Sequence, residues 1–418
     1  MQVELSDERG RIFCDPQAWT DMDAWHEQAT ELRRTEPILR VEGVGLSPLY
    51  VLTRHADVFD VSRRSDVFFN TQHSVLMPDG QLEMLQGMGI NPKTLIHMDG
   101  KEHNDYRHVT NDWFKPAAVR TRQDDIDAIA DEYVQKLADL GGECDFAQDI
   151  AVPYTLRVIM SIFGVPPSDE RLMLELTQGI FGAADPEYLD LGAFSDPFEY
   201  LTSTIGRFDD YFAHLTADRQ ANPTDDLASV IANGQVDGCP LERHASLWYY
   251  IIVATAGHDT TSYALSGGVN ELIRRPDQVQ ALREDPSLAD NAALESIRWA
   301  SPVRSFLRYA QRDTEVGGQP IAEGERVLLS YPAANRDESV FERADEFDIT
   351  RPDAGDLISF GVGVHYCLGS QFARREVRTF LPKLFDAVAE IEPAGDTEYT
   401  ASTFVSGVKH LPVRYRMK

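Results

Sequence analysis

The amino-acid sequence predicts a mainly α-helical protein with a minor β portion, built as a single domain. Eight stretches carry apolar residues at helical spacing, whereas only two segments, 43–51 and 314–329, carry apolar and β-branched runs bounded by Gly and Pro. No Pro-, Gly- or Ser-rich stretch and no run of one charge divides the 418 residues. We therefore expect one domain over residues 1–418, with 1–20 as a loosely ordered N-terminal arm.

The predicted helices follow one another along the chain, and each rests on apolar residues that recur about every 3.6 positions. They cover residues 21–34, 117–140, 153–163, 169–181, 203–219, 241–274, 288–299 and 370–388. The two β-type segments are too short for more than a few strands each. The fold class is therefore set by the helices.

The stretch 241–274 is unusual because a helix of that length is about 50 Å long at ~1.5 Å per residue and must cross the whole domain. Its middle changes from apolar residues to Gly257 and the polar residues that follow it, and a Gly inside a helix costs roughly 1 kcal/mol relative to Ala. Two interpretations are open. Either two helices meet here, with Gly257 as a C-cap and Asp259 as the next N-cap, or one helix is loosened beside a bound molecule.

Charge and hydropathy exclude several classes of partner. The 39 Lys and Arg against 68 Asp and Glu give a net charge of -29, with a pI near 4.7, which disfavours nucleic acid and anionic membrane surfaces. The chain starts with polar and acidic residues, and no apolar run approaches the ~20 residues that span a bilayer. We expect a cytoplasmic monomer with neither nucleic acid nor membrane as a partner.

The four cysteines, Cys14, Cys144, Cys239 and Cys367, lie far apart and form no C-x-x-C pair, so neither a zinc site nor a disulfide framework is indicated. Cys367 differs from the others because it lies in residues 360–369, Phe-Gly-Val-Gly-Val-His-Tyr-Cys-Leu-Gly, directly before a helical pattern. The glycines let the backbone run close to a flat partner, and a helix N-terminus stabilises a thiolate. A thiolate can bind haem iron. Taken alone, a Gly-flanked Cys before a helix would more often be structural.

The whole segment is more specific, because it matches the haem-binding signature F-x-x-G-x-x-x-C-x-G in full, at Phe360, Gly363, Cys367 and Gly369. Residues 256–261 match an oxygen-binding helix motif, and residues 295–298 match an E-x-x-R motif. From about residue 50 to its end the sequence therefore resembles the cytochrome P450 superfamily. It looks most like the bacterial terpene-alcohol (terpineol) hydroxylases.

This resemblance implies a cytochrome P450 fold in which a long central helix crosses the haem, so that 241–274 is one helix. It implies haem b as the cofactor, with the Cys367 thiolate as the axial iron ligand. The residues that it places around the haem are Phe360, Gly361, Gly369, Ala256 and Gly257. A third set, Glu295, Arg298 and Arg351, is expected to support haem incorporation structurally, although the first two are also spaced for a simple intrahelical ion pair.

The resemblance also assigns the haem propionates to four residues. His103 and Arg107 lie four apart on one face of a short helix, and Arg308 and His365 are the other two. A single His or Arg is more often a solvated surface residue, and the matching positions of all four reverse that preference. Many relatives place a further His just before the signature, where residues 356–359 of this chain have none.

Two residues in the middle of the long helix, Asp259 and Thr260, are implied to deliver protons during oxygen activation, while Gly257 lets the helix open for oxygen. A Thr hydroxyl inside a helix often bonds back to a carbonyl one turn earlier. Both statements can hold for the same residue.

Electrons must come from another protein, since the sequence has no flavin or iron–sulfur motif. The resemblance implies an acidic 2Fe-2S ferredoxin with its reductase. Docking to a chain of charge -29 needs a local basic patch. We expect this patch to consist of Lys115, Arg120, Arg374 and Arg375.

Segments that contact substrate in the family are apolar here, which implies a hydrophobic small molecule. We expect substrate contacts from Val253, Ala256, Val303, Phe306, Phe404, Val405, Met88 and Phe181, with Val75, Leu76, Met77 and Leu85 nearby. The expected reaction is hydroxylation of a terpenoid-like, or related alicyclic or aromatic, compound with O2. The alternatives are a steroid or alkyl-chain hydroxylase, or a haem protein that binds a ligand without oxidising it.

Overall fold

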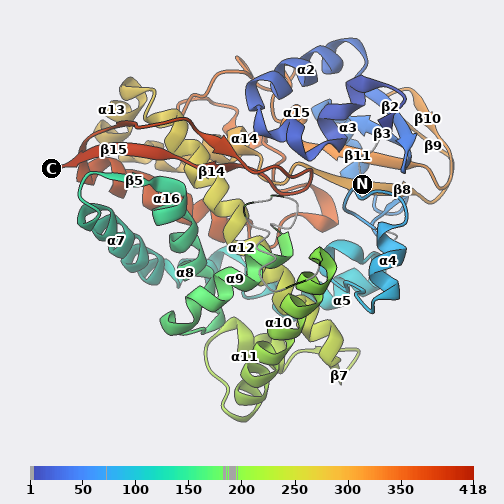
Figure 1. The fold of residues 1–418 in the computed structure, drawn as a ribbon, viewed down its shortest axis with the longest axis horizontal. Coiled ribbons are helices and arrows are strands. Elements are labelled where there is room, and N and C mark those ends of the chain that lie inside the picture. Colours follow the sequence, from blue (N-terminus) through green and yellow to red (C-terminus); the bar gives the residue numbers. More distant parts are fainter. Residues whose placement is uncertain (1–3, 72, 182–184, 186, 188–193, 195) are drawn as a thin grey trace.

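The computed structural model describes residues 4–71, 73–181, 185, 187, 194 and 196–418. Helices dominate them, as expected (Figure 1). They are α1 (Arg11–Cys14), α2 (Met22–Thr35), α3 (His55–Arg63), α4 (Gln81–Gly87), α5 (Gly100–Asn111), α6 (Pro116–Arg120), α7 (Gln123–Asp139), α8 (Val152–Phe163), α9 (Glu170–Phe181), α10 (Pro197–Ala221), α11 (Leu227–Ala232), α12 (Arg243–Leu272), α13 (Pro276–Glu284), α14 (Ala289–Ala300), α15 (Tyr331–Ala334) and α16 (Ser370–Ala387).

The strands are short. They are β1 (Glu4–Leu5), β2 (Ile38–Val44), β3 (Leu46–Leu52), β4 (Phe68–Phe69), β5 (Glu143–Asp145), β6 (Gln235–Val236), β7 (Cys239–Pro240), β8 (Ser305–Ala310), β9 (Thr314–Val316), β10 (Gln319–Ile321), β11 (Arg326–Ser330), β12 (Val388–Pro393), β13 (Glu398–Tyr399), β14 (Val408–His410) and β15 (Pro412–Met417). The segment expected at 43–51 falls on the β2–β3 hairpin, which turns at Gly45 with a φ of 78°. The segment 314–329 forms β9, β10 and most of β11.

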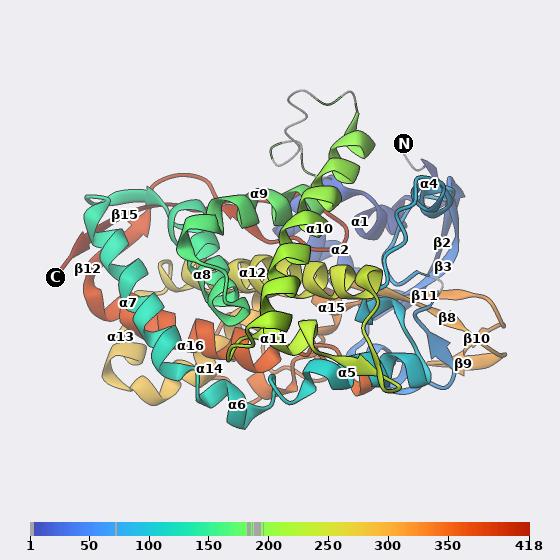
Figure 2. The ribbon, with the colours of Figure 1, turned by 90° about the horizontal axis from the view of Figure 1, so that it is seen from below.

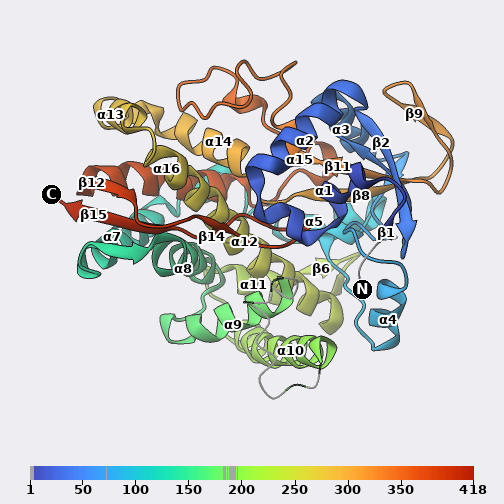
Figure 3. The same ribbon diagram turned by 45° about the horizontal axis from the view of Figure 1, so that its top comes forward.

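The largest sheet has the order β1-β2-β3-β11-β8-β4, and only its β3–β11 pair is parallel. Apolar residues of α2 pack with those of β2 and β3 in one buried cluster. A second, antiparallel sheet of β12, β15 and β5 lies at the other end of the molecule (Figures 1 and 3). Between the two sheets lies the helical part of the fold.

The N-terminal segment is the first correction to the sequence analysis. We expected a loosely ordered arm over residues 1–20, yet β1 pairs with β2, and Phe13 and Trp19 are buried. The Trp19 ring stacks on Trp25 of α2 with 4.4 Å between centroids. These aromatic residues bury large apolar areas, and that burial holds the segment against the sheet.

Helix α12 is continuous over 30 residues, so the interpretation as one helix is confirmed and the two-helix alternative is wrong. It runs through the middle of the molecule with α8 and α9 beside it (Figure 2). Close packing explains its glycines, because a Cβ on Gly257 would lie 2.8 Å from Ile159 Cγ1 of α8. A Cβ on Gly268 would collide with Ser296 of α14 in the same way.

Helix boundaries differ most from expectation at two places. The stretch 117–140 is two helices, because Arg122 has φ −97° and ψ 7°, outside the helical region. Helix α10 begins six residues before the expected 203, since the Asp196 carboxylate accepts hydrogen bonds from the backbone N–H groups of Phe198 and Glu199. In the described part of the chain, no helix combines the length and the apolar character needed to cross a membrane.

Candidate active site

A cavity of about 1510 Å³, part of it open to solvent, lies between the middle of α12 and the loop that carries Cys367. Residues 256, 257, 260 and 261 line it from α12, and residues 359–362 and 365–369 line it from the loop. Both walls that the sequence analysis expected around the haem therefore face one cavity.

The loop before α16 turns through two glycines in the left-handed region. Gly361 has φ 68° and Gly363 has φ 77°, and a Cβ on Gly363 would lie 2.8 Å from the Ser62 carbonyl oxygen. The Cys367 N–H then donates to the Phe360 carbonyl at 2.8 Å. This backbone geometry places Phe360, Gly361, Cys367 and Gly369 on the cavity wall, as the sequence analysis expected.

The Cys367 side chain has exposed surface and lines the cavity. Burial among protein atoms raises the pKa of its thiol, whereas the backbone N–H groups of Gly369 and Ser370 and the charge of Arg107 lower it. These N–H groups lie at the start of α16, where hydrogen bonds stabilise negative charge on sulfur. The donor set fits a metal-bound thiolate.

The four residues expected at the propionates also come together at this cavity. His103, Arg107, Arg308 and His365 all line it, and the rings of His103 and His365 are 4.2 Å apart between centroids. Arg107 donates to the Tyr366 carbonyl at 2.7 Å, and Arg308 donates to the Leu307 carbonyl at 2.8 Å.

These groups lack the anions that buried cations need. No ion pair recorded for the described residues involves Arg107 or Arg308, although Arg308 is only 4% exposed. His365 Nε2 has no hydrogen-bond partner and lies 3.6 Å from Asp99. Burial lowers the pKa of His103 to about 4 and also lowers that of His365. Two cations and two N–H donors facing one cavity fit the two carboxylates of a haem.

On the opposite wall, Ala256, Gly257 and Thr260 line the cavity, but Asp259 does not. The Thr260 hydroxyl donates to the Ala256 carbonyl one turn earlier at 2.9 Å. The half-buried Asp259 carboxylate instead lies beside its neighbour His258, with 3.0 Å between Oδ1 and Nδ1.

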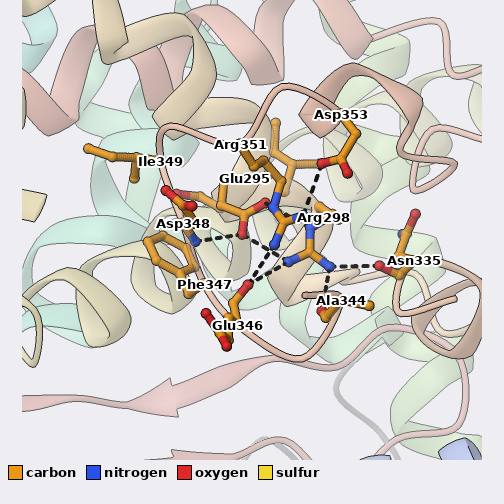
Figure 4. A network of polar contacts seen from close by, with 12 residues as sticks. Glu295, Arg298, Asn335, Ala344, Glu346, Phe347, Asp348, Ile349, Arg351 and Asp353 are labelled. Atoms are coloured by element: carbon orange, nitrogen blue, oxygen red, sulfur yellow. Dashed lines mark hydrogen bonds and ion pairs between the residues drawn. The ribbon is translucent and has the colours of Figure 1, made fainter. Parts of the chain in front are cut away.

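Glu295, Arg298 and Arg351 form a buried network outside the cavity (Figure 4). The Glu295 carboxylate is 2.7 Å from Arg298 Nε and 3.0 Å from Arg351 Nε. Arg298 also donates to the carbonyls of Asn335 and Ala344. The network ties α14 to the long segment that leads to the Cys367 loop, as a structural support would.

The expected substrate contacts divide into two groups. Val253, Ala256, Val303 and Phe306 line the cavity. Phe404 and Val405 do not, although the Phe404 ring lies 5.4 Å from Phe306 and Val405 forms a bridge with Val303. Met88 lines a separate surface hollow, and Val75, Leu76, Met77 and Leu85 also lie outside the cavity lining. The side chain of Phe181 lies outside the described residues.

Some residues of the expected basic patch contact other side chains of the protein. Lys115 pairs with Asp112 at 2.5 Å, and Arg375 donates to Gln123. Burial, and then the charges of Arg378 and Arg120, lower the pKa of Arg375, so these three arginines lie near one another. Arg374 is half-buried on the same helix. The sequence analysis missed Arg378, although its spacing of three from Arg375 indicated a shared face.

Other residues at the site were also missed. Asp99 accepts hydrogen bonds from the N–H groups of Asn70 and Thr71 and faces His365. Glu376 lines the cavity with Oε2 unpartnered, and burial raises its pKa well above the ordinary value. No local motif marks either of them, because their surroundings come from distant segments. Within residues 356–359, the stretch that lacks the His of many relatives, the Ser359 hydroxyl donates to the Ile297 carbonyl at 3.0 Å.

Comparison with known proteins gives consistent relatives. The family model "Cytochrome P450" matches residues 19–388. Cytochrome P450-terp from a Pseudomonas species is 39% identical over 414 residues, which cover 97% of this chain and 96% of the relative. A steroid C26-monooxygenase of Mycolicibacterium smegmatis is 30% identical over 93% of this chain and 90% of its own. Linalool 8-monooxygenase of Pseudomonas putida is 30% identical over 93% of this chain and 95% of its own.

The fold agrees with these matches. The crystal structure of CYP108D1 from Novosphingobium aromaticivorans superposes with a TM-score of 0.91 at 36% identity, and 98% of each chain is covered. With the Cys367 loop, the unpaired cations and the continuous α12 on the cavity walls, these matches leave one conclusion. The chain belongs to the cytochrome P450 family of monooxygenases, whose members bind haem b through a cysteine thiolate.

Proposed function

We propose that this P450 hydroxylates a hydrophobic small molecule of terpenoid, or related alicyclic or aromatic, type with O2 and two electrons from a ferredoxin. The carrying observation is the cavity wall formed by residues of α12 together with Pro302, Val303 and Phe306, in which none of the described residues is charged. Its residues are Ile252, Val253, Ala256, Gly257, Thr260, Thr261, Ala264, Pro302, Val303 and Phe306. Such a wall selects an apolar molecule.

The names of the relatives support two substrate classes. Linalool is a terpene alcohol, and the enzyme named for it is 30% identical to this chain. The steroid C26-monooxygenase is equally similar, so a steroid is the second candidate. The higher identity to cytochrome P450-terp favours the terpenoid class.

Bound haem supplies the iron at which O2 is activated. Cys367 would bind this iron, and the N–H groups of Gly369 and Ser370 stabilise the charge on its sulfur. Arg107, Arg308, His103 and His365 would hold the propionates, and a neutral imidazole still donates one N–H to a carboxylate. These contacts would hold the cofactor between the loop and α12.

Thr260 and Asp259 are proposed to handle protons. The single hydroxyl proton of Thr260 goes to the Ala256 carbonyl, so the hydroxyl oxygen can accept a hydrogen bond from a donor in the cavity. Asp259 lies one residue earlier and behind the wall, where its carboxylate can bind a proton and turn toward the cavity.

The electron donor is proposed to be an acidic 2Fe-2S ferredoxin with its reductase, working in the cytoplasm. Arg120, Arg375 and Arg378 bring positive charge together on and beside α16, the helix that starts three residues after Cys367, although Arg378 also pairs with Asp290 at 3.2 Å. On a chain of charge -29, this local inversion of sign favours an acidic partner.

A spin-state titration of the haem-loaded enzyme with terpenoids, monocyclic aromatics, steroids and alkyl acids tests the proposal. The best binders are then given to the enzyme with a surrogate ferredoxin and reductase. We expect terpenoids to give a shift to high spin and a hydroxylated product. A response to steroids alone would favour the second candidate, and a spin shift without any product would contradict oxidation in favour of simple ligand binding.

A pair of variants controls the titration. Val253→Trp fills the apolar wall, and we expect it to weaken binding of the best ligand. Met88→Ala lies outside the cavity and should leave the titration unchanged. Equal effects of both variants would contradict substrate binding at this wall.

A further inference from the structure

His258 is a completely buried imidazole on α12 with a polar atom near each ring nitrogen. It is 0% exposed. Its Nε2 lies 2.8 Å from the Thr177 hydroxyl of α9, and its Nδ1 lies 3.0 Å from Asp259 Oδ1. The Nδ1 contact is not aligned as a hydrogen bond, and no other partner reaches this nitrogen among the described residues.

The Thr177 hydroxyl has one proton and two acceptors within reach. It can donate to His258 Nε2 at 2.8 Å or to the Leu174 carbonyl at 3.1 Å. If it donates to Nε2, the ring proton of a neutral imidazole must be on Nδ1, facing the Asp259 carboxylate. If it donates to Leu174, the proton is on Nε2, and the Nδ1 lone pair faces the carboxylate oxygen. The first arrangement is the favourable one, because it places an N–H against the carboxylate oxygen, whereas the second places two lone pairs against each other.

We propose that His258 is a positioning residue which, with its tautomer set by Thr177, holds the Asp259 carboxylate in one orientation. The inference rests on the proposed proton-handling role of Asp259. Because the Nδ1–Oδ1 contact is short but not aligned, a rotation of the carboxylate completes or releases it. A buried nitrogen without a partner is unfavourable, so the hydrogen bond that this rotation completes favours the held orientation.

The arrangement joins three helices at one point of the site. Thr177 comes from α9, while Thr155 of α8 donates to the backbone carbonyl of His258 at 3.1 Å. Helices α8 and α9 both lie against α12 (Figure 2). Thr155 therefore supports the backbone of His258 and not its ring, and it provides a matched control for Thr177.

Four variants of the haem-loaded enzyme separate positioning from packing. His258→Asn keeps a donor near the Nδ1 position, whereas His258→Gln keeps one near Nε2 and loses the contact to Asp259. Thr177→Val removes the hydroxyl that sets the tautomer, and Thr155→Val removes only the backbone contact. Product rate, hydrogen peroxide per product and the solvent kinetic isotope effect are measured, with the carbon monoxide spectrum and substrate spin shift as checks of folding.

We expect His258→Gln and Thr177→Val to lower the product rate by roughly tenfold, since a misplacement of about 1 Å can cost up to ~100-fold. Both should form more peroxide and show a larger isotope effect, with an unchanged spin shift. His258→Asn and Thr155→Val should stay close to the parent enzyme. Equal behaviour of Gln and Asn, or of the two Val variants, would overturn the inference.

The failure of this inference can be distinguished from failure of the proposed function. If the parent forms product and Asp259→Asn slows it, while all four variants match the parent, only the positioning role of His258 is overturned. If the parent forms no product with any donor, the proposed function itself is overturned. In that case the spin shifts of the variants carry no weight for positioning.

Discussion

The two walls of the cavity are held by different kinds of contact. Around Cys367 the shape comes from backbone: left-handed φ angles at Gly361 and Gly363 and the bond from the Cys367 N–H to Phe360 lie within ten residues. On the α12 wall the polar residues depend on side chains from other helices. His258 contacts Thr177 and Thr155, which are 81 and 103 positions away along the chain.

This difference separates binding of the cofactor from use of it. Substitutions at the Cys367 loop and its supporting network should change whether and how haem is held. Substitutions on the α12 wall should leave haem bound and change how protons are delivered during turnover. The following variants test whether the two walls serve these separate roles.

The largest effect is expected from Cys367→His. A neutral imidazole cannot supply the negative charge that a thiolate gives to the iron, so turnover should be lost while some haem is retained. The carbon monoxide spectrum of the reduced protein should lose the thiolate-type Soret band. An unshifted band together with normal turnover would rule out Cys367 as the ligand.

The next largest effect is expected from Glu295→Gln. It removes the charge shared by Arg298 and Arg351 and leaves the buried Arg298 without its anion, at a cost of roughly 3–5 kcal/mol, whereas Arg351 keeps its ion pair with Asp353 at 2.9 Å. Chemical denaturation and the haem content of purified protein measure it. Arg351 and Arg298 keep their carbonyl contacts in this variant, so the loss comes from the charge.

Glu376→Gln is the matched control, because Glu376 is also buried but has an unpartnered oxygen. Burial raises the pKa of Glu376 in the folded state above its value in the unfolded chain. The protonated side chain therefore contributes its full stability below the unfolded-state pKa, and this contribution is lost as pH rises from there through the folded-state pKa. The Gln variant should therefore be as stable as the parent, or more stable, at neutral pH. A loss equal to that of Glu295→Gln would mean that burial alone, and not pairing, explains the network.

On the α12 wall, Asp259→Asn should slow product formation by roughly 100-fold, since general acid–base groups contribute about 10²–10⁴. Thr260→Ala should keep electron uptake but form more hydrogen peroxide per product. Without the Thr260 hydroxyl, proton delivery is no longer directed, and more of the reduced oxygen leaves as peroxide. Both variants should retain the parent carbon monoxide spectrum and substrate spin shift. A loss of haem in either one would break the division between the two walls.

The smallest effect is expected at the basic patch. Arg120→Glu should raise the ferredoxin concentration for half-maximal turnover by roughly fivefold, since an exposed charge pair is worth about 1 kcal/mol or less. The effect should fall as salt increases, because exposed charges are screened within ~8 Å at 0.15 M. Arg40→Glu, exposed on β2, is the control. Salt-insensitive turnover at limiting ferredoxin would show that docking is mainly apolar.

The Cys367 wall could be predicted from the sequence because its shape depends on residues that are close along the chain. Gly361, Gly363 and Cys367 are spaced by local backbone geometry, so the motif and the structure carry the same information. The place of α12 followed from the family resemblance, although the physical reason for Gly257 did not. Its close contact with Ile159 of α8 is set by tertiary packing.

Features that depend on tertiary packing could not be read from the sequence. Trp19 holds the N-terminal segment by stacking on Trp25, which no periodicity shows. Met88 is apolar and close in sequence to the site, yet the chain carries it to another hollow. The Thr177–His258 contact likewise joins α9 to α12 only after both helices have packed.

Turnover under isotopically labelled dioxygen tests the central claim most directly. The haem-loaded parent is supplied with its best spin-shifting ligand and a surrogate ferredoxin system, and the product is analysed by mass spectrometry. A monooxygenase must place one labelled oxygen atom in the product and release the other as water. Product without label, or labelled peroxide with no oxidised product, would contradict the account.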